Sequence, residues 1–270
     1  MRIAVLQANA VPGQVDTNVA RIAGAARRAA EGGAHLLVTP ELFTTGYVPA
    51  LVPRALLETS PEAIVGRLAN VASSCGIALV ASAPDRGPDG ALFIAAHLFD
   101  RAGARLATYR KTHLYGPDEA AVFTHGRGEL PIAALHGFRI GLLICYDIEF
   151  PEAVRGVALA GADLVCAPTA LPEPFGVVAR TLPPARALES QVFIAYANHC
   201  GQEGDTVLCG QSIIAAPDGS VLAAAGAAGE DLLFADLDPE LQRASRADNR
   251  YLSERRPDVY AAWERPARTG

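Results

Sequence analysis

The stretch FRIGLLICYDIEFPE, residues 138–152, changes character at Cys145. The residues that precede the cysteine form an apolar run typical of a buried strand, and Pro151 is a residue type that often occupies the first turn of a helix. Cys145 therefore lies at a predicted strand-to-helix turn, which can hold a nucleophile beside backbone N–H groups. A single cysteine on an apolar strand is also a common inert core residue, so this stretch alone leaves both interpretations open.

The same alternation of apolar strands and amphipathic helices continues on both sides of this stretch. Asp16 is expected to cap a helix that ends at Gly32 and Gly33, and Ser60 precedes a second helix that ends at Gly76. Strands apolar on both faces, with helices between them, indicate sheets covered by helices, an α/β fold. The expected strands are 2–8, 35–40, 77–83, 91–99, 104–110, 138–145, 163–169, 191–198, 211–217, 220–226 and 231–237, and further helices begin at Pro151 and span 176–190.

The length and composition suit one large domain that spans residues 1–270. Half of the residues are hydrophobic and 19% are charged, which excludes a disordered class. No internal repeat or linker-like break divides the chain. A polar, arginine-rich tail begins at about residue 243, and its Tyr251, Tyr260 and Trp263 can pack either on the domain or on a second copy of the chain, at a subunit interface.

Several classes of partner are excluded by charge and composition. The net charge is −6 and no basic stripe is present, so we expect no nucleic-acid partner. No run approaches the roughly 18 apolar residues of a membrane span, and the N-terminus lacks the apolar region of a signal peptide, so a cytoplasmic protein is expected. Five cysteines without a CxxC pair and six scattered histidines predict neither a disulfide framework nor a metal site.

Three predicted strand ends carry residues with complementary chemistry. Glu41 follows the strand at 35–40, Cys145 ends another strand, and Lys111, the sole lysine among 23 basic residues, follows the strand at 104–110. A thiol nucleophile needs a base, and a carboxylate in a desolvated site can serve as one. An oxyanion needs a cation or N–H donors, and a compact ammonium fits that need. Together the three residues indicate acyl transfer.

The motifs around these residues resemble the nitrilase, or carbon–nitrogen hydrolase, superfamily over nearly the whole chain. TPELFTTGY (39–47) is similar to its glutamate motif, YRKTHLYGPDE (109–119) to its lysine motif and ICYDIEFPE (144–152) to its cysteine motif. PPARALESQVFIAYANHCG (183–201) resembles the segment that follows the cysteine. The resemblance implies a four-layer α-β-β-α sandwich that forms a homodimer or a larger homo-oligomer, and a reaction without metal or organic cofactor.

The resemblance also implies a role for each motif residue. Glu41 would act as the general base, Cys145 as the nucleophile that forms a thioester, and Lys111 together with the backbone N–H of Tyr146 as the oxyanion site. A second family glutamate, eight positions after the lysine, corresponds to Glu119 and would fix Lys111 and the substrate. Asp118 stands beside it in the sequence, which makes this match less specific than the strand ends.

The expected reaction is hydrolysis of a small aliphatic primary amide, with or without an amine on the far end, as in the amidase-type branch that the cysteine motif resembles. Glu149 stands where some carboxylate-specific branches have arginine, so it favours a cationic substrate. Glu173, in the segment 168–176, and Tyr47 are further candidate substrate contacts. The alternatives are an N-carbamoyl amine hydrolase, a nitrilase, or a catalytically silent scaffold on the same fold.

Overall fold

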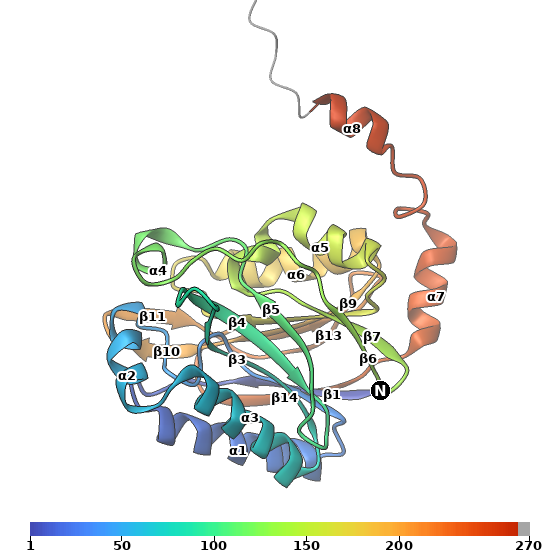
Figure 1. Ribbon diagram of the computed structural model, residues 1–270. Coiled ribbons are helices and arrows are strands. Elements are labelled where there is room, and N and C mark those ends of the chain that lie inside the picture. Colours follow the sequence, from blue (N-terminus) through green and yellow to red (C-terminus); the bar gives the residue numbers. More distant parts are fainter. Residues whose placement is uncertain (264–270) are drawn as a thin grey trace, which may run out of the picture.

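The computed structural model describes residues 1–263, and its frame is a pair of facing six-stranded sheets (Figure 1). The first sheet has the order β14-β1-β2-β3-β4-β5 and the second the order β13-β12-β9-β8-β7-β6. The strands of the first sheet are β1 (Arg2–Gln7), β2 (Leu36–Val38), β3 (Ala78–Arg86), β4 (Leu92–Phe99), β5 (Arg105–Arg110) and β14 (Asp231–Asp236). Those of the second are β6 (Ile132–Leu135), β7 (Phe138–Leu142), β8 (Leu164–Thr169), β9 (Phe193–Asn198), β12 (Ile213–Ala215) and β13 (Val221–Ala224).

Helices cover the outer face of each sheet, which gives the four layers that the sequence predicted. Figure 1 shows α1 (Val15–Glu31) and α3 (Pro61–Cys75) below the first sheet, and α5 (Pro151–Leu159) and α6 (Gly176–Ser190) above the second. The inner strands are buried on both faces because a sheet or a helix lies against each of them. The shorter elements near the sheet ends are η1 (Pro49–Leu51), α2 (Val52–Glu58), α4 (Gly116–Val122) and η2 (Cys145–Glu149).

The carboxyl ends of the two sheets' central strands meet at one edge of the sandwich. Strands β1, β2 and β3 run parallel in the first sheet, and β7, β8 and β9 run parallel in the second. Ala8, just after β1, forms a parallel bridge with His199, just after β9. The N–H of Glu41 donates to the carbonyl of Thr169, the last residue of β8, at 3.3 Å. The segments that follow these strands are therefore brought together.

Local details differ from the sequence prediction at several element ends. The expected N-cap Asp16 lies inside the first turn of α1, and Gln14 is the N-cap, without a side-chain cap hydrogen bond. The strand expected over residues 138–145 ends at Leu142, and Cys145 is the first residue of the short helix η2. The hairpin β10 (Cys200–Glu203) and β11 (Thr206–Cys209) was not predicted, since its short strands lack apolar alternation.

The C-terminal tail contains two helices where the sequence indicated only a polar segment. These are α7 (Pro239–Asp248) and α8 (Pro257–Trp263), and Figure 1 shows α8 standing away from both sheets. Trp263 is 72% exposed and Tyr251 is 45% exposed, so in a single copy neither is covered by the domain. A subunit interface formed by this tail stays a prediction. No helix among residues 1–263 has the length and apolar character needed to cross a membrane.

Candidate active site

Lys111 lies fully buried between two carboxylates at the end of β5. Its Nζ is 2.7 Å from Glu41 Oε1, 2.7 Å from Glu119 Oε1 and 2.9 Å from Glu119 Oε2. Glu41 and Lys111 are 0% exposed and Glu119 is 1% exposed. Buried charges persist in proteins when they are paired and hydrogen-bonded. The structure thus brings Glu41 into contact with Lys111, 70 positions away in the sequence, while Glu119 comes from the same motif as Lys111.

The geometry decides between the two neighbouring acids of the lysine motif. Glu119 points inward from the first turn of α4, where its Oε2 accepts the N–H of Tyr115 at 2.8 Å. Its Oε1 accepts the hydroxyl of Tyr47 at 2.6 Å. Asp118 is exposed. The buried Tyr47 was predicted as a substrate contact, and it lies at the border of the site. Its hydrogen bond to Glu119 was not predicted from the sequence.

Cys145 occupies a strained turn between β7 and α5. Its φ is +48°, a left-handed conformation that residues other than glycine seldom adopt. The buried Asp147 supports this turn, because its Oδ2 accepts the N–H of Ile144 at 3.1 Å and the hydroxyl of Tyr109 at 2.8 Å. Its Oδ1 accepts the N–H of His113 at 2.9 Å. The predicted elbow is present, and Asp147 is the anchor that the sequence analysis missed.

The charges of the site shift the pKa values of its three central groups. Burial, opposed by Lys111 and reinforced by Glu119, raises the pKa of Glu41 to about 7. Burial together with the Glu41 carboxylate raises the pKa of the Cys145 thiol, against the effect of Lys111. Burial alone would lower the pKa of Lys111, but Glu41, Cys145 and Glu119 raise it above its usual value. Lys111 is thus a permanent cation, and Glu41 can change its protonation state near neutral pH.

One oxygen of Glu41 is left free in this arrangement. Oε1 is held by Lys111, whereas the buried Oε2 has no hydrogen-bond partner among residues 1–263, and the Cys145 thiol is near enough to Glu41 to lower its pKa. A buried acceptor without a partner is costly and is seldom retained without a functional reason. This oxygen can accept a proton from a thiol or a water molecule, so the site has a base, a nucleophile and a fixed cation within one buried cluster.

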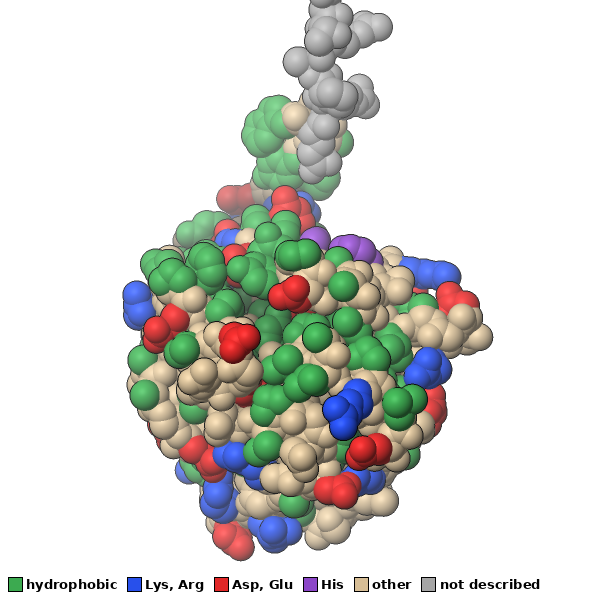
Figure 2. Space-filling model, turned by 90° about the vertical axis from the view of Figure 1, so that its left-hand side faces the viewer, with side chains coloured by type: hydrophobic (Ala, Val, Ile, Leu, Met, Phe, Trp, Pro, Cys, Tyr) green, Lys and Arg blue, Asp and Glu red, His purple; other side chains and the backbone are tan. Residues whose placement is uncertain are grey.

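A cavity of about 750 Å³ opens beside this cluster, between α4 and the hairpin β10–β11. Tyr47 and Glu119 line it, so it reaches the hydrogen-bonded groups around Lys111. Its wall also carries Asp118, Glu173 and Asp205, and in the part of the chain that the structure describes no lysine or arginine belongs to its lining. Figure 2 shows a face of the molecule near whose centre acidic side chains lie among hydrophobic ones.

The two acids predicted to contact the substrate, Glu149 and Glu173, differ in their position relative to this cavity. Glu173 is exposed and lines this cavity. Glu149 is half-buried and does not belong to the cavity lining; burial raises its pKa, against the effects of Arg186 and Lys111. Glu149 therefore lies within the electrostatic reach of Lys111 but outside the cavity lining.

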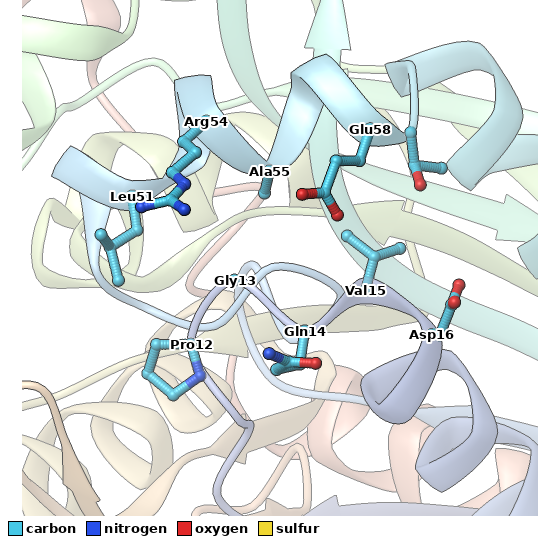
Figure 3. Close-up of a pocket in the computed structure, with 10 residues that line it drawn as sticks. Pro12, Gly13, Gln14, Val15, Asp16, Leu51, Arg54, Ala55 and Glu58 are labelled. Atoms are coloured by element: carbon cyan, nitrogen blue, oxygen red, sulfur yellow. The ribbon is translucent and has the colours of Figure 1, made fainter.

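Another cavity, of about 260 Å³, lies apart from these residues (Figure 3). It is formed by the start of α1 and by α2, with the Arg54 and Glu58 side chains near it, and it contains neither Cys145 nor Lys111. Among residues 1–263, no group of three or more His, Cys, Asp or Glu side chains is arranged to hold a metal ion.

Comparison with known proteins shows the family of the chain. The family model for carbon-nitrogen hydrolases matches residues 2–247. The chain is 45% identical to a Pseudomonas protegens protein described as the hydrolase in the 5′ region of pqqF, over 96% of this chain and 90% of that protein. It is 35% identical to an (R)-stereoselective amidase from Pseudomonas sp., over 95% of this chain and 92% of that protein.

Solved structures of an amidase from Nesterenkonia sp. AN1 have the same fold. A double mutant of that amidase in complex with acrylamide is 42% identical, with a TM-score of 0.89 over 97% of each chain. A mutant in complex with butyramide is also 42% identical, with a TM-score of 0.88 over 97% of each chain. Fold, site and relatives together define a hydrolase of carbon–nitrogen bonds. The chain belongs to the carbon-nitrogen hydrolase family of the nitrilase superfamily, and it is an amidase.

Proposed function

We propose that this amidase hydrolyses small aliphatic primary amides to a carboxylic acid and ammonia, through a thioester on Cys145. The observation that carries the proposal is the buried ammonium of Lys111, held between Glu41 and Glu119 and close enough to the strained turn of Cys145 to act on the thiol's pKa. A scaffold would have no use for buried charges and a free carboxylate oxygen at one place, because each of them costs stability.

In the first half of the reaction, Glu41 accepts the proton of the Cys145 thiol through its free Oε2, and the sulfur attacks the amide carbon. The carbonyl oxygen becomes an oxyanion, for which Lys111 and the N–H of Tyr146 provide positive charge and a donor. One N–H of Lys111 can be shared by both oxygens of Glu119, which leaves another N–H for the oxyanion. Collapse of this intermediate breaks the C–N bond, and Glu41 returns the proton to the leaving ammonia.

In the second half, Glu41 acts as a base again and removes a proton from a water molecule. The resulting hydroxide attacks the thioester carbon, the C–S bond breaks, and the carboxylic acid leaves. The proton held by Glu41 returns to the sulfur of Cys145, which restores the starting state. Glu119 and Tyr47 keep Lys111 in place throughout, since neither needs to change its charge.

The cavity favours a neutral or cationic far end of the substrate over an anionic one. Asp118, Glu173 and Asp205 line it, no basic side chain among the described residues balances them there, and Glu149 adds a further acid within reach of Lys111. A substrate carboxylate would be repelled by this field, whereas an ω-amine would be attracted. The acrylamide and butyramide complexes of the Nesterenkonia amidase support small aliphatic amides as the substrate class.

The test is ammonia release from matched four- and five-carbon amides that end in a methyl, an amine or a carboxylate. We expect turnover of the methyl and amine series, at least tenfold lower kcat/KM for the carboxylate series, and none for any of them with Cys145→Ala. Preference for the carboxylate series would refute the role given to the acidic wall.

The same panel separates the alternative functions. Nitriles and N-carbamoyl amines are included, and the latter release carbon dioxide together with ammonia. Faster turnover of either class than of the amides would replace the proposal. An absence of turnover, with equal iodoacetamide labelling of all five cysteines instead of selective labelling of Cys145, would indicate a silent scaffold.

A further inference from the structure

His199 is a fully buried histidine that contacts the backbone of Glu41 from behind the site. It follows β9, and its Nε2 lies 2.6 Å from the carbonyl oxygen of Glu41. Its Nδ1 lies 2.6 Å from Oε1 of Glu203, in β10. A carbonyl oxygen can only accept a hydrogen bond, so Nε2 carries a hydrogen. The state of Nδ1 then depends on whether Glu203 is ionised.

Two backbone contacts indicate that Glu203 is a carboxylate. Its Oε1 accepts the N–H of Ala10 at 2.6 Å, and its Oε2 accepts the N–H of Tyr47 at 2.7 Å. Donors on both oxygens favour the ionised form, which can only accept. The hydrogen between Glu203 and His199 therefore belongs to Nδ1, and the ring carries two hydrogens and a positive charge.

The electrostatics of the pair agree with this assignment. Burial opposes both charges, but Glu203 raises the pKa of His199 above its usual value. Burial would likewise raise the pKa of Glu203, but His199 and the two backbone N–H groups lower it. A buried ion pair is sustained when each member also makes hydrogen bonds, as both members do here.

The pair holds the two ends of the loop that carries the base. His199 bonds the carbonyl of Glu41, and Glu203 bonds the N–H of Tyr47, six residues later. Phe43, between them, stacks on the His199 ring with centroids 5.4 Å apart. A side chain at Gly46, whose φ is +77°, would approach Glu203 Oε2 to 3.2 Å, so the loop lies tightly against the pair.

We propose that His199 and Glu203 form a buried imidazolium–carboxylate pair that positions Glu41 for proton transfer. The pair fixes the loop from Glu41 to Tyr47 so that one oxygen of the base stays on Lys111 and the other faces the nucleophile. It carries no net charge, so it acts through position and not by tuning the base. The role rests on the proposed function of Glu41, since without that chemistry the pair would only support a loop.

The first experiment reads the charge of His199 without any substrate. The full-length protein is labelled with ¹⁵N-histidine, and long-range ¹H–¹⁵N spectra are recorded between pH 6 and 8.5. The signal is assigned by its loss in His199→Gln. We expect both ring nitrogens of His199 to be protonated across this range. A neutral ring with one bare nitrogen at pH 7 would overturn the proposal.

The second experiment tests the positioning of Glu41 by measuring kcat and KM in variants of His199. In His199→Leu, which has no donor for the Glu41 carbonyl, we expect kcat to fall 30-fold or more while KM changes less than threefold. His199→Gln keeps an amide N–H and should recover kcat about tenfold relative to His199→Leu. His97→Gln is the matched control, because His97 is equally buried but bonds Thr108 in the first sheet. Its kcat per folded molecule should equal that of the wild type.

Two outcomes would separate a failure of this role from a failure of the proposed function. If His199→Leu and His97→Gln lose the same fraction of kcat per folded molecule, His199 is only structural and the role is refuted. If no amide is turned over, the rate of iodoacetamide alkylation at Cys145 replaces kcat as the readout. Should the leucine variant not fold, the comparison of His199→Gln with the wild type and the spectra of the wild type decide the question.

Discussion

Replacing Glu119 by glutamine should lower the pKa of the base Glu41 and move the pH profile of the enzyme. The nearer oxygens of Glu41 and Glu119 each lie 2.7 Å from the same Lys111 Nζ, so they are at most twice that distance apart, about 5.4 Å. At an effective dielectric constant of about 20, two unit charges at that separation repel each other by about 3 kcal/mol, equivalent to about 2 pKa units. Because Lys111 stays in place and shields part of this repulsion, we expect a downward shift of about 1 to 2 units.

The assay is kcat/KM for a neutral amide between pH 5 and 9. Glu41 must be ionised to accept the thiol proton, so the rate falls as the pH drops through the pKa of Glu41. That pKa is raised to about 7 in the intact site, which places the acid limb of the wild type near pH 7. In Glu119→Gln the limb should lie near pH 5 to 6, even though the maximal rate is lower because Lys111 has lost a partner.

The neighbouring acid provides the control for this experiment. Asp118→Asn removes a charge one position away in the sequence, but Asp118 is exposed and its field is screened by water and salt. Its acid limb should stay within about 0.3 units of the wild type. An unchanged or upward-shifted limb in Glu119→Gln would refute the coupling between Glu119 and Glu41. If turnover is too slow to measure, the pH dependence of Cys145 alkylation reports the same ionisation.

Two further changes test the oxyanion cation and the packing behind the nucleophile. Lys111→Arg should lower kcat at least about 100-fold, because a planar guanidinium cannot direct one donor from the space that the ammonium occupies. A folded variant with kcat near that of the wild type would refute the role of Lys111 as the oxyanion cation. Gly141→Ala should lower the free energy of unfolding by about 1 to 3 kcal/mol in thermal or urea melts, because its new methyl group would overlap Val157 Cγ1. Gly24→Ala, in α1 with nothing within 4 Å of the new methyl group, should instead leave stability equal or higher, and equal losses in both variants would contradict the packing argument.

The sequence could predict the layers of the fold and the three strand ends of the site. Apolar strands and amphipathic helices repeat at the periods that their burial requires, so the long central elements are visible locally. The short hairpin β10–β11 and the polar tail helices α7 and α8 lack such patterns and were not predicted. Glu41, Lys111 and Cys145 follow such strands. Strand β5, which precedes Lys111, runs in the same direction as β2 and β3 across the antiparallel β4, so Glu41 and Lys111 meet at one edge of the first sheet. The exact turn at Cys145 was not predictable, because a φ of +48° in a residue other than glycine depends on the surrounding contacts.

The charged residues that support the site could not be found in this way. Asp147 and Glu203 look like ordinary surface acids in the sequence, yet both are buried because their partners come from other elements. His199 lies 158 positions from the carbonyl that it bonds. Glu119 was expected only from the family resemblance, because Asp118 beside it is chemically alike, and the orientation of α4 is what turns Glu119 toward Lys111.

The raised pKa of Glu41 explains why two carboxylates surround one ammonium. In the proposed reaction Glu41 takes a proton from sulfur, gives it to ammonia and then takes another from water, and this cycle requires that neither of its protonation states be strongly preferred. A single salt bridge to Lys111 would hold Glu41 ionised at low pH and make it a poor proton donor. Burial opposes the salt bridge most strongly and the charge of Glu119 adds to this effect, so that the pKa of Glu41 rises to about 7, where donation and acceptance are balanced. Lys111 stays charged beside both acids, which lets it serve the oxyanion while the base changes its protonation state.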